Sequence, residues 1–475
     1  MPKPPEKAAG SSTRDYGRTA GFLTIGVGLT GIFTYAYFLI ASHDLNEDAY
    51  GEIAFLWSAV FITVSTLYRP IDQLLSRHIS EHIERGETDV GPVRVAAKIQ
   101  GCLAVGFAVI ALILKQPLEN LLYGNSTLYW VFFSAVLFYA ASYFARGYLA
   151  GHQQFGLFTT LILSESVFRT LFAALVAFGL LSGQSMVAMG IVAAPLLSLL
   201  VVPIAITRRS RREAEERAAY AAAHGEGQED LAAEEEEARE EFSLAHGAGF
   251  VGSIFLIMFS EQVFLNAGPL VIGIVKGSAA TGFIFNVLMI ARAPLQLFQA
   301  VSTSILPHLT ALHSSEDPDS EHQFHRSVRM VLAGILAFTA LTAVVVVLAG
   351  PKLMQIAFGA DHTYDRLGLL LVTAGMGLYL STVTVNQACV AQGQARRASI
   401  RWISCAIFFI VWTVVPFIDD GNLRVELGFA LTAFLLLSLL TYIYFRPRGI
   451  DEDIPVKGSS EAIEARLAGL EDTST

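Results

Sequence analysis

The chain has 475 residues, of which 53% are hydrophobic and only 16% are charged, and its mean hydropathy is +0.52. These values exclude an ordinary soluble protein and indicate a chain that crosses a membrane several times. The formal net charge of −10 is concentrated in polar segments after Arg212 and after Arg448, so it does not define one acidic surface, and we expect no nucleic-acid partner.

A membrane-spanning helix needs about 20 apolar residues, and the sequence contains twelve such runs. The first six are centred near Gly31, Val60, Val105, Val136, Ala173 and Ala194. The second six are centred near Ile257, Ile290, Leu341, Gly375, Phe409 and Phe434. The first run follows a polar leader, residues 1–18, and is too long for the core of a signal peptide, so we expect it to remain as a helix.

The positions of Lys and Arg predict the orientation, because short cytoplasmic loops retain positive charge. With the N-terminus inside, the inner segments hold most of the 32 Lys and Arg residues. The predicted outer loops then hold only Lys115, Lys276, Lys352, Arg366 and Arg424. We therefore expect a multi-pass protein of the plasma membrane with both termini in the cytoplasm.

An acidic segment divides the chain into two halves. Residues 19–206 are predicted to form one six-helix bundle and residues 244–445 a second, joined by a cytoplasmic linker of residues 207–243 and followed by an acidic tail, residues 446–475. Because six is even, both halves start on the same side of the membrane, and a repeat between them must be parallel. The predicted fold class is thus an all-α membrane protein with two bundles related by a pseudo-two-fold axis.

Three short matches support such a repeat. AYGEI (Ala49–Ile53) matches ATGFI (Ala280–Ile284), and the same offset pairs QLLSRHISEH (73–82) with SILPHLTALH (304–313). YLAGHQQF (148–155) resembles VAQGQARR (390–397), with a glycine at the end of the fourth helix of each half. The order of the matches indicates an internal duplication.

Four segments carry a resemblance to a known family: LNEDAYGEIAFLWSAVFI, ARGYLAGHQQF, ARAPLQLFQAVSTSILPHLTAL and NQACVAQGQARRA. They resemble the polysaccharide-transporter, or lipid-linked oligosaccharide (Wzx-like) flippase, branch of the MATE-like flippase (MOP) superfamily, over about residues 19–444. The resemblance implies two bundles around a central cavity that opens alternately to each side. It also implies that undecaprenyl-pyrophosphate-linked glycans are the cargo and that other polysaccharide assembly proteins are partners.

The fifth run, LILSESVFRTLFAALVAFGLL, contains Glu165 and Arg169. A lone charge at the centre of a membrane helix costs roughly 2.5–3.5 kcal/mol on insertion scales, so such residues usually face the protein interior or a wet cavity. Their i, i+4 spacing favours an ion pair on one helix face. A structural pair is the favoured interpretation, and a contact with substrate is the alternative.

Arg292 lies in the eighth run beside Pro294, with no acidic residue one turn away. A proline weakens the helix and frees carbonyl groups that usually face a cavity, so Arg292 is a candidate substrate-binding residue. The alternative is a salt bridge with Glu261, which is also a candidate site for a coupling H⁺ or Na⁺. Asn286 and Gln296 add polar groups that fit either a wet cavity or interhelical hydrogen bonds.

Arg69, Asp72, Arg77 and Arg146 lie at the predicted cytoplasmic ends of the second and fourth helices. Most such arginines anchor the topology, and the alternative is a site that first binds the pyrophosphate head group. His308, His313, His322 and His325 lie in or beside a polar loop, so we expect no metal site and no cofactor other than a coupling ion.

These patterns favour a secondary transporter over other classes. The chain has no G-x-x-x-x-G-K-[ST] motif for an ATP-driven pump, and its outer loops are too short for a polysaccharide polymerase or ligase. The alternatives are a MATE-type drug or cation antiporter and, in a different class, a membrane enzyme or scaffold of a polysaccharide assembly pathway. Residues 19–41 lack the acidic residue typical of MATE exporters and the arginine typical of lipid II flippases.

Overall fold

The computed structural model describes residues 9–85, 90–203, 233–302, 320–358 and 365–446, and this part of the chain is all-helical. The first half contains α1 (Ala9–Asp44), α2 (Glu47–Leu67), α3 (Arg69–Arg85), α4 (Val90–Ile113), α5 (Lys115–Leu121), α6 (Ser126–Gly151), α7 (Phe155–Ala177), α8 (Gln184–Ser198) and the short η1 (Leu199–Val201). The second half contains α10 (Ala233–Lys276), α11 (Ser278–Ser302), α13 (Ser320–Phe358), α14 (Arg366–Ala391), α15 (Ala395–Val414) and α16 (Gly421–Phe445).

Eleven stretches within the described residues are long and apolar enough to cross a membrane, and each coincides with a predicted span. The second predicted span combines α2 with the first part of α3, as Glu47–Ser80. The remaining predicted span, centred on Ile290, is α11, whose described apolar part runs from Ser278 to Ala291. The predicted all-α membrane fold is therefore confirmed. Of the predicted linker, residues 233–243 form the start of α10, and residues 204–232 lie outside the described part.

Helix starts follow ordinary capping chemistry. The side chain of Asn46 accepts a hydrogen bond from the backbone N–H of Ala49 (2.8 Å), and that of Asn125 accepts one from Thr127 (3.1 Å). Asp420 caps α16 in the same way, so this helix begins earlier than the sequence reading placed it. Arg424, predicted to lie in an outer loop, instead lies in the first turns of α16 and is only 3% exposed. The capping aspartate was the signal for the earlier start.

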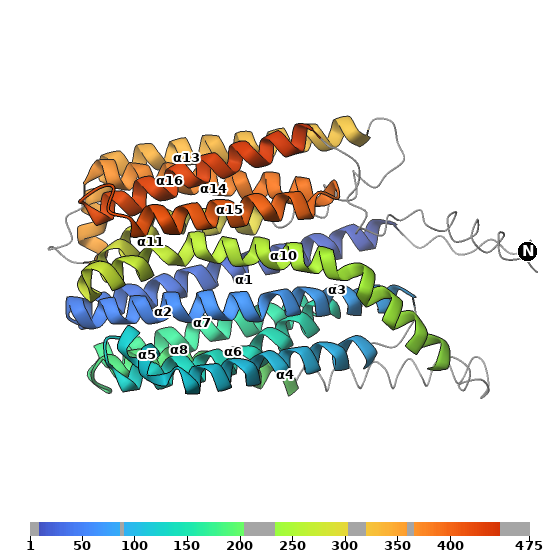
Figure 1. Ribbon diagram of the computed structural model, residues 1–475, viewed down its shortest axis with the longest axis horizontal. Coiled ribbons are helices and arrows are strands. Elements are labelled where there is room, and N and C mark those ends of the chain that lie inside the picture. Colours follow the sequence, from blue (N-terminus) through green and yellow to red (C-terminus); the bar gives the residue numbers. More distant parts are fainter. Residues whose placement is uncertain (1–8, 86–89, 204–232, 303–319, 359–364, 447–475) are drawn as a thin grey trace, which may run out of the picture.

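The two halves repeat one packing pattern (Figure 1). In the first half α7 packs against α1 and α8, and α8 packs against α6; in the second half α15 packs against α10 and α16, and α16 packs against α14. The contacts between halves are also reciprocal, because α1 packs against α11 and α10 packs against α2. This is the arrangement expected for two bundles related by a parallel pseudo-two-fold axis.

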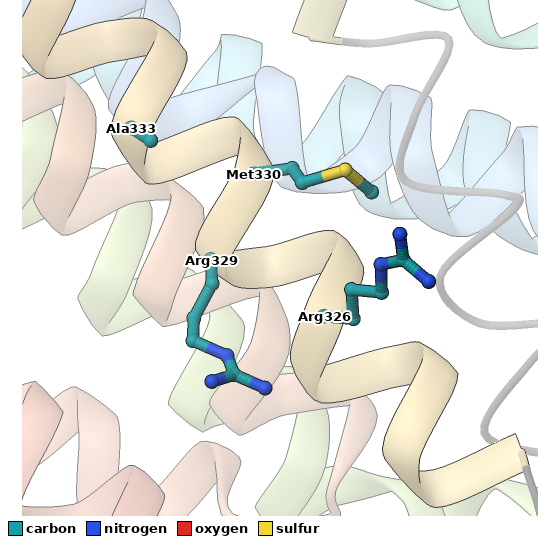
Figure 2. Close-up of a pocket in the computed structure, with 4 residues that line it drawn as sticks. All are labelled: Arg326, Arg329, Met330 and Ala333. Atoms are coloured by element: carbon teal, nitrogen blue, oxygen red, sulfur yellow. The ribbon is translucent and has the colours of Figure 1, made fainter.

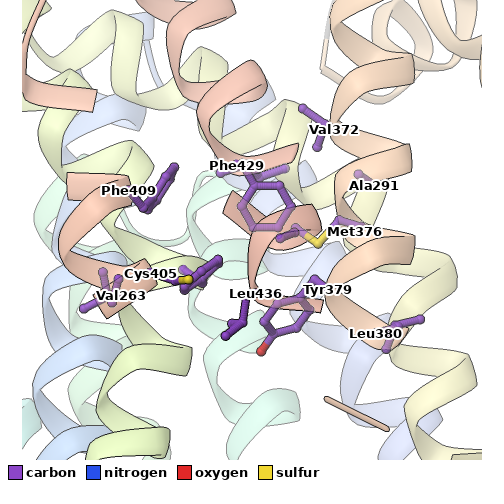
Figure 3. Close-up of a cluster of buried hydrophobic side chains, with 14 of the residues drawn as sticks. Val263, Ala291, Val372, Met376, Tyr379, Leu380, Cys405, Phe409, Phe429 and Leu436 are labelled. Carbon is purple, nitrogen blue, oxygen red and sulfur yellow. The ribbon is translucent and has the colours of Figure 1, made fainter. Parts of the chain in front are cut away.

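Each bundle has its own hydrophobic core. The core of the second bundle includes Phe264 of α10, whose ring stacks on that of Phe409 of α15 at 5.7 Å between centroids. Phe429 of α16 packs beside Phe409 (Figure 3). The core of the first bundle is built from α1, α2, α6, α7 and α8, and it also receives Phe285 and Met289 of α11. The eighth predicted span thus contributes side chains to both cores.

The sequence repeat has a structural counterpart. AYGEI and ATGFI each start two residues after the first residue of their helix, α2 and α11 respectively. In the match between YLAGHQQF and VAQGQARR, the helices end at Gly151 and Ala391 and restart at Phe155 and Ala395. The equivalent turn positions are thus Gln153 (φ +55°) and Gly393 (φ +77°), both left-handed, so the glycine-to-glycine alignment of that match is off by two residues. The third matched pair includes residues 304–313, which lie outside the described residues.

Two glycines one turn apart bring α6 close to α3. A Cβ atom on Gly147 would lie 2.6 Å from the carbonyl oxygen of Asp72, and one on Gly151 would lie 2.7 Å from the Cβ of Ile79. Small residues at this spacing allow membrane helices to approach closely. This close packing places the start of α3 beside the end of α6, where several of the charged residues lie.

Candidate functional site

The first bundle buries a carboxylate among donors from neighbouring helices. Glu165 of α7 is only 4% exposed and forms an ion pair with Arg146 of α6. It also accepts hydrogen bonds from the hydroxyl of Ser142 and, at 3.5 Å, from that of Ser198 at the end of α8. The Arg146 guanidinium lies 4.4 Å from the centroid of the Tyr143 ring. The charge of Glu165 within the membrane-spanning helix is therefore neutralised by Arg146 of α6.

The expected pair between Glu165 and Arg169 is replaced by two separate environments. Arg169 donates a hydrogen bond to the hydroxyl of Tyr139 (3.1 Å). Its guanidinium lies 4.5 Å from the Trp57 ring centroid and 5.9 Å from that of Phe61, both on α2. The sequence showed only the partner on the same helix, whereas packing supplies Glu165 with a cation from α6 and Arg169 with aromatic faces, which attract cations.

A second ion pair joins the two halves. Arg69, the first residue of α3, lies 3.3 Å from Glu261 of α10, measured from Nη1 to Oε2. The hydroxyl of Tyr379 of α14 donates to Oε1 of the same carboxylate at 3.1 Å. The Arg69 side chain is 35% exposed and that of Glu261 is 16% exposed. Glu261 thus has an arginine of the first half and a tyrosine of the second half on its two oxygens.

Asp72 lies beside both ion pairs. It lies one turn after Arg69 on α3, and its backbone contacts α6 at Gly147, the residue after Arg146. Acidic and basic residues therefore alternate along a row that we call the charge row, namely Glu165, Arg146, Asp72, Arg69 and Glu261. The row runs from the interior of the first bundle to the second bundle.

A tight crossing joins the halves where α2 and α11 begin. A Cβ atom on Gly51 would lie 1.8 Å from the carbonyl oxygen of Ser278, and one on Gly282 would lie 3.2 Å from the Cα of Gly51. The Asp48 carboxylate accepts a hydrogen bond from the Ser278 hydroxyl at 2.6 Å. These two glycines occupy equivalent positions of the AYGEI and ATGFI repeat. We call this contact the glycine crossing.

Polar side chains surround the glycine crossing. Asn286, fully buried, accepts a hydrogen bond from the hydroxyl of Tyr50. The Tyr123 hydroxyl lies 3.4 Å from that of Thr281, and burial raises the pKa of Tyr123, so this hydroxyl stays protonated at neutral pH. Asn286, a candidate substrate-binding residue from the sequence, is thus engaged with α2 in this structure.

The remaining candidates fall into three groups. Arg77 is exposed on α3 and belongs to neither the charge row nor the glycine crossing. Arg292 and Gln296 belong to α11, but their side chains lie outside the described residues, as do those of His308, His313 and His322. His325 lies against the hydroxyl of Tyr444.

Sequence reasoning missed a buried carboxyl group on α16. Glu426 is 2% exposed, and its Oε1 has no hydrogen-bond partner within the described part of the chain. Its sequence context, LRVELGF, alternates charged and apolar residues, which resembles a loop more than a buried helix. The capping residue Asp420 was the available signal that Glu426 lies within a helix.

Comparison with solved structures identifies the fold. The chain superposes with a TM-score of 0.59 on a mutant of the Vibrio cholerae MATE transporter VcmN, at 14% identity over 92% of this chain and 97% of that one. It superposes with a TM-score of 0.58 on the inward-facing conformation of a multidrug resistance MATE family transporter of the MOP superfamily, at 10% identity over 95% of this chain and 99% of that one. With a eukaryotic MATE transporter the TM-score is 0.57, at 11% identity over 93% of this chain and 97% of that one. Neither a protein-family model nor a curated protein matches the sequence. The chain therefore has the MATE transporter fold.

Proposed function

We propose that this protein is a secondary transporter that exposes a site between its bundles alternately to the two sides of the membrane. The observation that carries the proposal is the Arg69–Glu261 ion pair, which joins residues of different halves. Alternating access in folds with parallel repeats is largely a rocking of one bundle against the other. Rocking that separates α3 from α10 would break this pair. The halves also meet at the glycine crossing, which is a different contact at the starts of α2 and α11.

Glu261 is the proposed coupling residue, with H⁺ or Na⁺ as the ion. A carboxylate in a membrane-spanning helix is energetically costly to insert, so its presence there indicates a candidate functional residue. Its present partners are an arginine that is a third exposed and a neutral tyrosine. Binding of a cation at Glu261 would weaken its attraction to Arg69, and would thereby favour the separated state of the bundles.

The proposed cargo is a lipid-linked oligosaccharide, moved from the inner to the outer leaflet of the plasma membrane with both termini of the protein in the cytoplasm. The four family-like segments and the distribution of Lys and Arg support this proposal. Arg292, Arg169, Glu165, Asn286 and Gln296 are the proposed cargo-binding residues, and Arg69, Arg77 and Arg146 would meet the pyrophosphate first. The MATE fold equally supports a drug or cation antiporter, which is the second candidate function.

Purified protein in proteoliposomes distinguishes these cargoes. We expect an undecaprenyl-pyrophosphate-linked glycan to change leaflet in a protein-dependent way, with a rate that responds to an imposed H⁺ or Na⁺ gradient. Leaflet position is read by the access of a membrane-impermeant glycan-modifying enzyme. Gradient-driven uptake of an organic cation such as ethidium, without glycan movement, would favour the antiporter. Failure to move either cargo, with folded protein, would contradict the proposed function.

We expect Arg69→Gln and Glu261→Gln each to reduce transport about tenfold or more while leaving folding nearly intact. The pair is partly exposed, so its contribution to stability is only about 0–1 kcal/mol. The exchange Arg69→Glu with Glu261→Arg should restore part of the activity, because the inter-bundle attraction is regained. Rates in proteoliposomes and thermal unfolding in detergent measure the two effects.

The matched control is Arg94→Gln, which removes an exposed arginine of α4. This variant should transport at the wild-type rate. Two results would contradict a coupling role of the Arg69–Glu261 pair. One is an equal loss of transport rate in Arg94→Gln and Arg69→Gln, and the other is a loss of stability in Arg69→Gln and Glu261→Gln that is as large as their loss of transport.

A further inference from the structure

The helix α13 exposes a long apolar face. Its membrane-spanning part, His325–Ile356, is the most apolar span of the described chain, with a mean hydropathy of 2.7 and only 11% of that window buried. Large side chains with more than half of their surface exposed recur along the helix, namely Met330, Leu336, Leu341, Val344, Leu348 and Ile356. In a membrane, this face lies against lipid acyl chains.

Two exposed arginines stand at the start of this face. Arg326 and Arg329 are one turn apart, within the first five residues of the span. The Nε of Arg329 donates to the carbonyl oxygen of His325 at 3.3 Å, which orients its guanidinium and leaves its Nη groups available. A charged residue at this depth lies where lipid head groups meet the hydrocarbon.

An open pocket of about 460 Å³ joins these arginines to the apolar face. Its lining combines Arg326 and Arg329 with Met330 and Ala333 (Figure 2). Figure 2 shows the Arg326 and Met330 side chains on one side of the helix and Arg329 directed to another. A ligand of this pocket therefore lies between two cations, one on each side of the helix, and it also meets the apolar side chains of Met330 and Ala333.

No carboxylate neutralises these arginines within the described residues. Neither Arg326 nor Arg329 has a salt bridge there, and Glu261, also in this half, is paired with Arg69. Asp365 and Asp420 cap the starts of α14 and α16, whereas His325 contacts Tyr444 near the end of α16. The two aspartates thus lie at the opposite end of the bundle, and the described residues that line the pocket carry only positive charge.

We propose that this pocket binds an anionic phospholipid, whose phosphate contacts Arg326 and Arg329 and whose acyl chain lies along Met330 and the apolar face beyond it. Guanidinium groups suit phosphate oxygens, and the continuous apolar face gives a lipid an advantage over a free anion. The site is separate from the charge row and the glycine crossing, and it does not depend on the identity of the cargo.

The test uses the full-length protein in a zwitterionic detergent with added phosphatidylglycerol or phosphatidylcholine. Bound lipids are counted by native mass spectrometry, and the shift of the thermal unfolding midpoint is titrated against lipid. We expect phosphatidylglycerol to bind and stabilise more strongly than phosphatidylcholine. Arg326→Gln with Arg329→Gln should weaken phosphatidylglycerol binding about tenfold or more, whereas the double lysine variant should keep part of it.

The matched control removes two other arginines of the same half, as Arg396→Gln with Arg401→Gln on α15, and should leave phosphatidylglycerol binding within about twofold. Equal losses in the two double glutamine variants would mean general charge attraction and would overturn the site. Competition by millimolar inorganic phosphate would indicate a free-anion site and would overturn the lipid assignment. Unchanged binding in Arg326→Gln with Arg329→Gln would also contradict the proposal.

Discussion

Arg146→Met is expected to destabilise the folded protein by roughly 3 kcal/mol or more, because it leaves the Glu165 carboxyl group inside the bundle without its cation. Glu165 is 4% exposed, so water cannot replace the lost partner. The hydroxyls of Ser142 and Ser198 remain, but neutral donors stabilise a buried carboxylate less than an arginine does. Unfolding of the purified protein by heat or by added denaturing detergent measures the effect.

A second substitution separates the ion pair from simple loss of packing. Arg146→Met combined with Glu165→Gln should recover most of the stability, because replacing both members of a buried pair is often nearly neutral. Arg169→Met should cost less, about 1–2 kcal/mol for its contacts with aromatic rings. Arg94→Met, on the exposed face of α4, serves as the control and should stay within about 0.5 kcal/mol of wild type. Greater damage from Arg169→Met than from Arg146→Met would mean that Glu165 pairs along its own helix.

The order and extent of the helices could be predicted from the sequence because their signals are local. An apolar run of about 20 residues identifies a span wherever its neighbours lie, and α6, α7 and α14 follow this rule. The start of α16 was missed because two charged residues, Arg424 and Glu426, interrupt the apolar run. Both are nevertheless buried, so these charged residues belong to the helix face that packs inside the bundle and not to a loop.

Pairing of charges was predictable only in part, because the sequence shows partners on the same helix and hides those on other helices. Glu165 was recognised as needing a partner, but Arg146 lies 19 residues away and reaches it only through the packing of α6 on α7. Likewise, Arg69 and Glu261 are 192 residues apart. The close approach of α3 to α6 at Gly147 brings the charge row together. The spacing of Gly147 and Gly151 indicates a close helix contact, but it does not identify the partner helix.

Gly51→Ala is expected to disrupt the contact between the two halves more than any other glycine substitution at the glycine crossing. The new Cβ would lie 1.8 Å from the carbonyl oxygen of Ser278 and 2.3 Å from its carbonyl carbon, so the backbones of α2 and α11 must separate. Overpacking of this kind typically costs about 1–3 kcal/mol. On Gly282 a Cβ would meet a ring carbon of Tyr50 at 2.9 Å, and part of that strain can be relieved by the side chain.

Disulfide formation measures this contact directly, in a background with the exposed Cys102 changed to serine. Asp48→Cys and Ser278→Cys replace side chains whose oxygens are 2.6 Å apart, so the pair should cross-link readily. Adding Gly51→Ala should slow cross-linking about tenfold or more, because 1.4 kcal/mol corresponds to a factor of ten, and Gly282→Ala should slow it less. Gly106→Ala is the control. Among the described residues, no atom outside its own helix backbone lies within 4 Å of its Cβ position, and alanine in an open helical site should stabilise by about 0.5–1 kcal/mol. Cross-linking that is insensitive to Gly51→Ala would mean that a small residue at position 51 is not needed for the close approach of α2 to α11. Transport by that variant at the wild-type rate would exclude the glycine crossing from the transport cycle.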